Sequence, residues 1–250
     1  MPSVKVMGIV NVTPDSFSDG GMFFRPEEAV RRALNLVEDG ADIIDLGGES
    51  TRPGAESIGW REEWSRIDPV LRTLAGKTPV MISIDTYHPE TAALALSAGA
   101  GMINCVKLES AAAMMELTSA GMNRRDGAGI QLVLPAKILD DQLLRSRLFS
   151  LQTTCFLDPM IGFGTTREED IALLKSIPSL AGKWRVLVGA SRKRIVKKLT
   201  GEKMPGKDIA GNVAVALWAA AHGASAVRVH DVRETVQALK VFSVLDSGGD

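Results

Sequence analysis

Short apolar segments alternate with longer amphipathic segments along the chain. The apolar segments lie at residues 4–10, 41–47, 79–85, 101–106, 130–134, 154–158, 185–191 and 225–230. Most of them are rich in Val and Ile and lack regular polar alternation, as expected for parallel strands that are covered on both faces. The pattern therefore predicts eight buried strands.

Residues at helical spacing fill the intervals between these strands. The first predicted helix begins at Pro26, has Glu27 and Glu28 in its first turn, and ends before Gly40. Proline and acidic residues are favoured in the first turn of a helix, and glycine is favoured after the last turn. Similar segments lie at about 61–75, 89–98, 110–120, 139–150, 167–177, 207–222 and 232–245.

Eight strand–helix pairs in 250 residues fit the size and element order of a (β/α)8 barrel, also called a TIM barrel. An open doubly wound α/β sheet also alternates strands and helices, but eight parallel strands are many for one such sheet. No GxGxxG segment follows an early strand, and no GxxxxGK[ST] phosphate-binding loop is present. Because no linker or low-complexity segment interrupts the pattern, we expect a single domain over residues 1–250.

The charge balance narrows the class of partner. Lys plus Arg is 29 and Asp plus Glu is 30, which argues against nucleic acid or an anionic membrane surface as the main partner. Cys105 and Cys155 lie far apart and form no CxxC pair, so neither a zinc site nor a disulfide framework is indicated. Since no signal-like start and no membrane-length apolar run are found, we expect a cytoplasmic enzyme.

Polar residues at the predicted strand ends are the candidates for function, because active sites of such barrels lie at the carboxyl ends of the strands. Asp85, Asn104 and Asp158 lie at or next to three of these ends. Together they would form a floor of hydrogen-bond acceptors, which matches a flat heterocycle with ring N–H and amino donors. For Asp85 a structural ion pair is the alternative, since an unpaired buried carboxylate is costly.

Basic residues at other strand ends indicate an anionic ligand. Arg52 follows the second strand, and Lys193 begins a helix together with Ser191. A helix start that offers a hydroxyl and free N–H groups suits a carboxylate or a phosphate. Arg228 and His230 are two residues apart and therefore lie on the same side of a strand. For Arg52 a solvent-exposed turn residue is the alternative interpretation.

The segment at residues 11–21, NVTPDSFSDGG, is polar, ends in two glycines and is longer than a barrel turn requires. We expect it to form a mobile flap, with Asp- and Ser-rich turns as the alternative. No Cys, Ser-His-Asp or Lys arrangement indicates a covalent nucleophile, and no cluster has the spacing of zinc ligands. The combined pattern suits a planar nitrogen heterocycle that carries a polyanion.

Six segments together resemble the dihydropteroate synthase family: GIVNVTPDSFSDGG (8–21), GGESTRPGA (47–55), SIDTY (83–87), FLDPMIGFG (156–164), VGASRK (188–193) and VRVHDV (227–232). They occur in the order of the family's motifs. The family is a (β/α)8 barrel that condenses 6-hydroxymethyl-7,8-dihydropterin pyrophosphate with p-aminobenzoate. The products are 7,8-dihydropteroate and pyrophosphate, and the path is SN1-like and assisted by Mg²⁺. The resemblance therefore implies a transferase of folate biosynthesis.

The resemblance also implies roles for single residues. Asp85, Asn104 and Asp158 would bind the ring donors of the pterin, and Lys193 would contact the oxygen and nitrogen edge of the ring. The pyrophosphate would be bound by Arg52, Arg228 and His230. Asn11 would help to bind Mg²⁺ and pyrophosphate.

For the second substrate, the resemblance implies that Ser191 binds the carboxylate of p-aminobenzoate. Thr51, Pro53 and Phe163 would line the slot for its ring. Asp15 and Asp19 would belong to the flap that closes over the site. Sulfonamides resemble p-aminobenzoate and would compete with it, and the family implies a homodimer formed through late helices such as the one at 207–222.

The chain departs from the family pattern around the fifth strand. The segment IQLVLPAKILDD (130–141) lacks the family's Met-His-Met segment, and the stretch between Asn104 and Asp158 is shortened. Met160 stands where the family usually has glycine, and it could narrow the pocket or replace the lost thioether contact. These differences concern the pterin wall more than the pyrophosphate residues.

Two other functions stay open. A methyltetrahydrofolate-dependent methyltransferase shares the pterin-binding barrel, but it has no use for residues that bind pyrophosphate or p-aminobenzoate. A non-catalytic pterin-binding homologue would keep the barrel and release no pyrophosphate.

Overall fold

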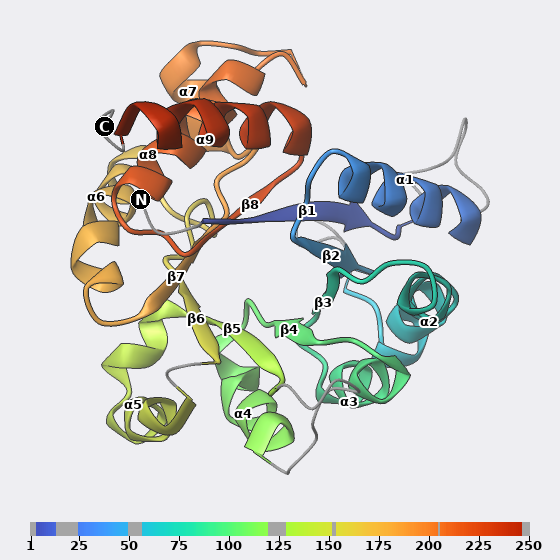
Figure 1. Cartoon of the computed structure of the whole chain (residues 1–250). Coiled ribbons are helices and arrows are strands. Elements are labelled where there is room, and N and C mark those ends of the chain that lie inside the picture. Colours follow the sequence, from blue (N-terminus) through green and yellow to red (C-terminus); the bar gives the residue numbers. More distant parts are fainter. Residues whose placement is uncertain are drawn as a thin grey trace.

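The computed structural model describes residues 4–13, 25–49, 57–119, 129–151, 154–204 and 206–246. In these ranges, parallel strands follow one another in chain order and close into a barrel, in which β8 pairs with β1 (Figure 1). The predicted (β/α)8 barrel is confirmed. The strands are β1 (Lys5–Asn11), β2 (Ile43–Gly47), β3 (Met81–Asp85), β4 (Met102–Asn104), β5 (Gln131–Pro135), β6 (Cys155–Asp158), β7 (Arg185–Val188) and β8 (Ala226–Val229).

The helices surround the barrel and connect its strands (Figure 1). They are α1 (Pro26–Glu38), α2 (Trp60–Ala75), α3 (Pro89–Ala98), α4 (Ala111–Ser119), α5 (Gln142–Leu148), α6 (Arg167–Ala181), α7 (Arg194–Thr200), α8 (Ile209–Ala221) and α9 (Val232–Asp246). Short 3-10 helices are η2 (Leu108–Ser110), η3 (Ala136–Asp140) and η4 (Phe149–Leu151). No helix within the described ranges is long and apolar enough to cross a membrane.

Two helix predictions need correction. The continuous helix predicted at 139–150 is divided among η3, α5 and η4, because Asp141 has an extended backbone and its carboxylate accepts the Leu144 N–H to begin a new helix. Two helices, α7 and α8, lie between β7 and β8, where the sequence pattern predicts a helix only at 207–222. Gly201 adopts a left-handed conformation, with φ of 73°, and this ends α7.

Local sequence signals explain where other helices begin. Pro26 opens α1 with Glu27 and Glu28 in the first turn, as predicted. Thr166 and Glu169 form a reciprocal capping box at the start of α6: the Thr166 hydroxyl accepts the Glu169 N–H at 3.2 Å, and the Glu169 carboxylate accepts the Thr166 N–H at 2.7 Å. These caps satisfy N–H groups that have no partner within a helix.

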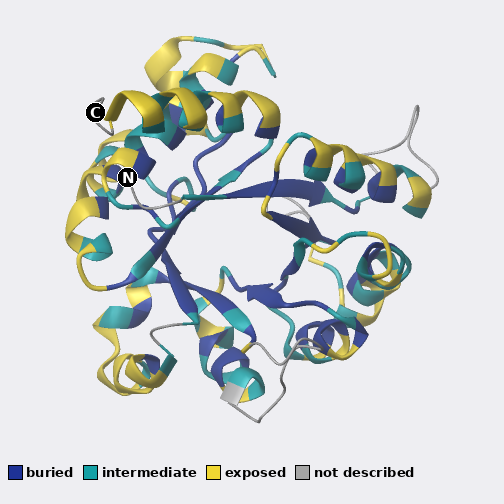
Figure 2. Cartoon of the chain, in the orientation of Figure 1, coloured by how far each residue is buried: buried dark blue, intermediate teal, exposed yellow. Residues whose placement is uncertain are grey.

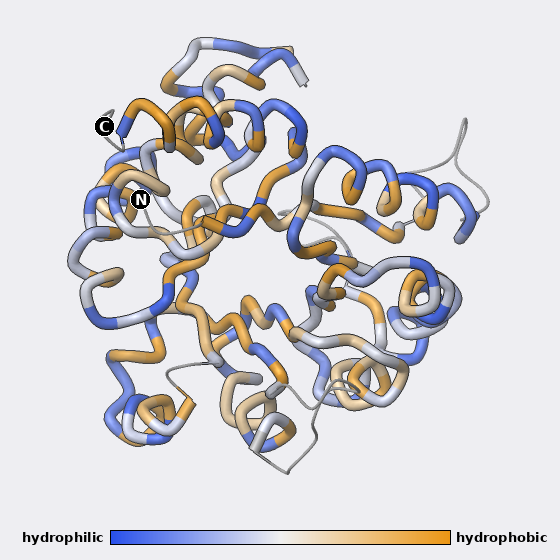
Figure 3. The backbone as a smooth tube through the Cα atoms, viewed as in Figure 1, coloured by the Kyte–Doolittle hydropathy of each residue, from blue (hydrophilic) through white to orange (hydrophobic). Residues whose placement is uncertain are grey.

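Apolar side chains form two separate clusters. The larger cluster fills the space between the strands and the helices, so the strands are buried while the outward helix faces are exposed (Figure 2). The tube coloured by hydropathy shows the same division, with apolar residues along the strands and polar residues on the outer helix surfaces (Figure 3). The smaller cluster lies inside the barrel and consists of Met7, Ile43, Met102, Val133, Phe156, Leu187 and Ala226.

The strand register brings polar residues together above this inner apolar cluster. Asn11 pairs with Gly47, Gly47 pairs with Asp85, and Asp85 pairs with Asn104. Side chains alternate between the two faces of a strand, so paired residues share one face. These positions share the alternation of Met7, Ile43 and Met102 in the inner cluster, and they therefore face the barrel interior at its carboxyl end.

The backbone is strained directly after β6. Met160 has a φ of 65°, in the left-handed region that favours glycine, and only 8% of the residue is exposed. Its N–H donates to Asp158 Oδ1 at 2.7 Å, so this conformation orients the carboxylate that ends β6. Met160 belongs to neither apolar cluster.

We expect Met160→Gly to be more stable than Met160→Ala by about 1 kcal/mol, because both variants remove the side chain but only glycine relieves the positive φ. Chemical denaturation of the two variants measures the difference. Ala95→Gly, in the interior of α3, is the control with an ordinary helical backbone, and there glycine lowers the stability. A Met160→Gly protein that is less stable than Met160→Ala would contradict the assigned strain.

Candidate active site

The structure brings most of the predicted site residues to the carboxyl end of the barrel. Asp85, Asn104 and Asp158 end their strands, while Ser191 and Lys193 follow β7. The remaining described members of the predicted set are Asn11 at the end of β1, Phe163 after β6, and Arg228 and His230 at the end of β8. Five predicted residues lie outside the described ranges: Asp15, Asp19, Thr51, Arg52 and Pro53.

Arg228 is bound between two carboxylates inside the barrel. Its Nε donates to Asp45 Oδ2 at 2.6 Å, and its Nη2 donates to Asp85 Oδ2 at 2.7 Å. Asp45 is fully buried, and its Oδ2 also accepts Nδ2 of Asn104 at 3.1 Å. The ion pair that was the alternative interpretation of Asp85 is therefore present, and it includes a residue predicted for the site.

Asp45 is the site residue that the sequence interpretation missed. It lies in the second apolar segment, IIDLG, whose nearly unbroken apolar pattern predicts a buried strand. The signal was its position two residues before Gly47, which puts it on the same face as the residues at the strand ends. An acidic residue on the interior face of a strand requires a partner, and Arg228 supplies it.

Lys193 and Asp158 form the other side of the mouth. Nζ of Lys193 donates to the Ile161 carbonyl at 2.6 Å and lies 4.2 Å from the centre of the Phe163 ring. A Cβ atom placed on Gly189 would lie 3.8 Å from Asp158 Oδ2, so this oxygen borders the space beside the strand end. The second oxygen of Asp158 is already used by the Met160 N–H.

The pKa values of this cluster are shifted chiefly by burial. Burial raises the pKa of Asp85 to about 7, although the Arg228 charge opposes the shift. The pKa of Asp158 is also raised by burial, against the effect of Lys193. Burial lowers the pKa of Lys193 to about 8, while the charge of Asp158 opposes this. For Arg228, burial acts to lower the pKa, but the charges of Asp45 and Asp85 outweigh it and raise the pKa, so the guanidinium stays charged.

Several buried oxygens at the mouth have no hydrogen-bond partner among the described residues. They are Asp45 Oδ1, Ser83 Oγ, Asp85 Oδ1 and Asn104 Oδ1. Buried polar atoms in native proteins are nearly always paired, so these three Asp and Asn acceptors and the Ser83 hydroxyl call for partners, chiefly donors, from a ligand or from water. The arrangement agrees with the predicted acceptor floor for a heterocycle with N–H donors.

Ser191 and His230 meet across the ends of β7 and β8. Ser191 Oγ lies 3.1 Å from His230 Nδ1 and accepts the backbone N–H of His230 at 3.2 Å. Arg228 and His230 contact different partners among the described residues, because Arg228 binds Asp45 and Asp85 while His230 lies against Ser191. The mouth thus has Arg228 buried between Asp45 and Asp85, with the Ser191–His230 pair beside it.

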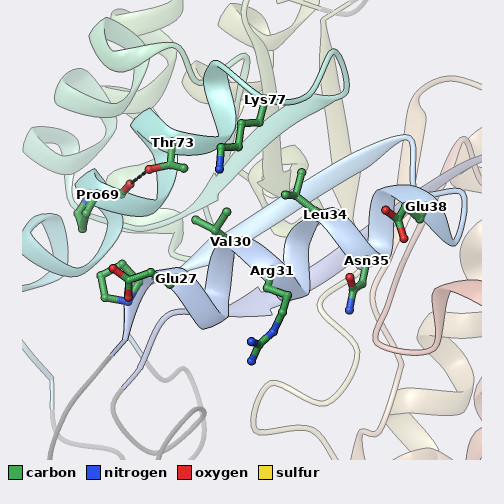
Figure 4. Close-up of a pocket in the computed structure, with 10 residues that line it drawn as sticks. Glu27, Val30, Arg31, Leu34, Asn35, Glu38, Pro69, Thr73 and Lys77 are labelled. Carbon is green, nitrogen blue, oxygen red and sulfur yellow. Dashed lines mark hydrogen bonds between the residues drawn. The ribbon is translucent and has the colours of Figure 1, made fainter.

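A cavity of about 460 Å³ lies elsewhere, between α1 and α2 (Figure 4). Val30 and Leu34 of α1 point across it toward Thr73 and Lys77 from the region of α2. Among the predicted site residues that the structure describes, none lines this cavity. The clustered charges and unpaired oxygens therefore assign the candidate site to the barrel mouth.

Comparison with known proteins relates this chain to pterin binding enzymes. The family model described as "Pterin binding enzyme" matches residues 7–123 and 145–230. The unmatched residues between these ranges contain β5, where the sequence departs from the pattern of dihydropteroate synthases. A dihydropteroate synthase of Synechocystis is 37% identical over 270 residues, which cover 96% of this chain and 89% of that protein.

Solved structures of dihydropteroate synthases are also similar to this chain. A dihydropteroate synthase of Xanthomonas albilineans with 4-aminobenzoic acid has a TM-score of 0.85 and 38% identity, covering 99% of this chain and 95% of that chain. The enzyme of the same organism in complex with 7,8-dihydropteroate has a TM-score of 0.81 and 35% identity, with the same coverage of both chains.

We expect Asp45→Ala to lower the free energy of unfolding by about 3 kcal/mol, because the change removes one partner of a buried ion pair. Asp45→Asn keeps an acceptor oxygen and should cost less. Chemical denaturation measures both, with Asp39→Ala as the control, since Asp39 pairs with the exposed Arg233 on the surface and should cost under about 1 kcal/mol. Equal losses for Asp45→Ala and Asp39→Ala would contradict the role given to the buried pair.

Proposed function

The chain belongs to the dihydropteroate synthase family of pterin binding enzymes, and from this we propose how the barrel mouth joins a dihydropterin pyrophosphate to p-aminobenzoate. One observation carries the assignment. Unpaired buried acceptors of Asp85 and Asn104 lie in the same mouth as the cations Arg228 and Lys193. A pterin offers ring N–H and amino donors to the acceptors, and its pyrophosphate requires the cations.

The pterin ring binds to three strand ends. Asp85, Asn104 and Asp158 accept hydrogen bonds from its ring N–H and amino groups. Lys193 donates to the oxygen and nitrogen edge of the ring, which its position beside Asp158 and Phe163 supports. When a donor of the ring binds a buried acceptor, that acceptor is no longer unsatisfied. The site therefore selects the ring by the pattern of its hydrogen-bond donors.

The reaction breaks the bond between the exocyclic methylene carbon and the pyrophosphate oxygen. The electron pair leaves with the pyrophosphate, and the electrons of the dihydropterin delocalise the positive charge left on the methylene. Arg228 and His230, together with Arg52, stabilise the negative charge of the leaving group. Two of the five N–H donors of Arg228 bind Asp45 and Asp85, which leaves others for phosphate oxygens.

The amine of p-aminobenzoate then forms the new C–N bond to the methylene carbon and afterwards loses one proton. An aromatic amine is unprotonated at neutral pH, so no strong general base is needed to activate it. Ser191 binds the carboxylate of p-aminobenzoate, and Phe163, with Thr51 and Pro53, borders its ring. Sulfonamides have the shape of this substrate and compete for the same place.

Magnesium fits this mouth as a substrate-bound ion. Among the described residues, no group of three or more His, Cys, Asp or Glu side chains could hold a metal by itself. A Cβ atom on Gly47 would lie 3.9 Å from Asp85 Oδ2 and 4.0 Å from Asn11 Oδ1, so two oxygens border that space. Mg²⁺ prefers oxygen ligands and commonly takes few from the protein, with phosphates and water completing its shell. Asn11 would hold it, and the bound ion would neutralise charge on the pyrophosphate.

A homodimer is supported by the composition of α8. Ala210, Ala214 and Ala221 are exposed on this almost wholly apolar helix, and Val244 and Leu245 are exposed on the neighbouring α9. A surface helix that is apolar on its outer side indicates an interface. We expect light scattering to give twice the chain mass of 26.7 kDa, and the mass of a single chain would refute the dimer.

We expect pyrophosphate release to require the dihydropterin pyrophosphate, p-aminobenzoate and Mg²⁺ together, with dihydropteroate as the product. Omitting each component in turn measures this in a coupled assay. Arg228→Ala should lower kcat roughly a hundredfold or more, because it removes charge stabilisation of the leaving group. Arg233→Ala is the control, since this Arg is exposed on α9 and pairs with Asp39.

A folded protein that binds the pterin but releases no pyrophosphate would instead support a non-catalytic homologue. Pyrophosphate release in the presence of p-aminobenzoate without formation of dihydropteroate would contradict the assignment of the second substrate.

We expect kcat/KM to fall below pH about 7 and again above pH about 8. Below the raised pKa of Asp85 its carboxyl gains a proton and loses acceptor capacity, and above the lowered pKa of Lys193 its amine loses its charge. A pH series of kcat/KM measures both limbs. In Lys193→Arg the guanidinium stays charged, so the alkaline limb should move to higher pH, and an unmoved limb would show that Lys193 does not cause it.

A further inference from the structure

Three segments that are distant in sequence meet beside Ser191 and His230. Arg192 directly follows Ser191 after β7, Asp231 directly follows His230 after β8, and Asn212 lies in the first turn of α8. Asn212 and Asp231 are 3% and 7% exposed, so both are buried polar side chains. None of the three is among the residues assigned above to substrate.

Arg192 has a strained backbone that Asn212 holds. Its φ is 59°, a conformation that side chains other than glycine rarely adopt. The N–H of Arg192 donates to Asn212 Oδ1 at 2.9 Å. Strained residues of this kind persist when the surrounding structure fixes them, and they concentrate at functional sites. Here the fixing group is a carboxamide oxygen from α8.

The amide nitrogen of Asn212 binds the segment that follows β8. Its Nδ2 donates to Asp231 Oδ2 at 3.2 Å, and Asp231 Oδ1 accepts Nη2 of Arg192. Each of the three residues therefore contacts both of the others. A carboxamide donates through its nitrogen and accepts through its oxygen, with no charge that changes with pH, and both capacities are used here.

We propose that Asn212 is a positioning residue, whose carboxamide fixes the turns after β7 and β8 and so sets the geometry of Ser191 against His230. The inference rests on the proposed function, in which these two residues bind the anionic parts of the substrates. Asn212 contacts no reacting atom. It acts through Arg192 and Asp231, which directly follow Ser191 and His230 in the chain.

Asn212→Asp is the sharpest test because it keeps the size and the acceptor toward Arg192 but puts a carboxylate against Asp231. We expect KM for p-aminobenzoate and for the dihydropterin pyrophosphate to rise about tenfold or more. Binding of 6-hydroxymethylpterin, which has no pyrophosphate, should stay within about twofold of wild type by calorimetry, because the ring acceptors Asp85 and Asn104 lie on β3 and β4, away from the changed contact. Asn212→Ala should raise both KM values similarly.

A double variant tests the pairing itself. In Asn212→Asp/Asp231→Asn the N–H donor moves to the other residue, so one carboxylate and one carboxamide again face each other. We expect this variant to recover most of the wild-type KM. Ala216→Gly is the matched control, since Ala216 lies one turn along the buried face of α8 and its change weakens the helix without altering the pairing.

The ring signals of His230 give a readout that does not depend on activity. The chain has 3 histidines, so His88 and His222 serve as internal references in an NMR spectrum. We expect the His230 ring signals to move in Asn212→Asp and to return in the double variant, while those of His88 and His222 stay in place. Three outcomes would overturn the inference. They are unmoved His230 signals in Asn212→Asp, KM values of Asn212→Asp equal to those of Ala216→Gly, and a double variant whose KM values do not return toward wild type. An inactive wild-type enzyme whose His230 signals respond as expected would refute the proposed function alone.

Discussion

The ion pairs of Arg228 with Asp45 and Asp85 join β8 to β2 and β3 across the barrel interior. A carboxylate inside an apolar barrel is tolerated only with a countercharge, and one guanidinium serves both. Asn104 adds a hydrogen bond from β4 to the same Asp45 oxygen. The cluster thereby sets the distances between strands that supply the acceptors of the mouth.

This charged layer lies directly above an apolar layer. Met7, Ile43 and Phe156 are among the side chains that fill the interior below it, so the barrel is closed by packing rather than open as a pore. Burial then shifts the pKa values of Asp85 and Lys193 toward neutrality from opposite sides. A pterin would supply hydrogen-bond donors to the unpaired acceptors of this layer, and a pyrophosphate would supply negative charge to its cations.

Two strained residues lie at the rim of the mouth, in the loops that follow β6 and β7. Met160 orients Asp158 through its N–H, and the N–H of Arg192 is held by Asn212. In both cases a positive φ directs a backbone donor toward a side-chain oxygen. The rigid barrel supplies the contacts that keep these conformations, which neither loop would adopt alone.

The sequence by itself determined the barrel and most of its mouth, because both follow from local rules. Unbroken apolar segments at regular spacing indicated the parallel strands, and polar residues at their ends, such as Asp85 and Asp158, indicated the site. The sequence did not show that helix formation is interrupted at Asp141, where a side-chain cap competes with helix continuation. It also did not identify Asp45 or Asn212, since each depends on a partner far along the chain. Arg228 is 183 residues from Asp45, and only closure of the barrel brings the two charges within contact.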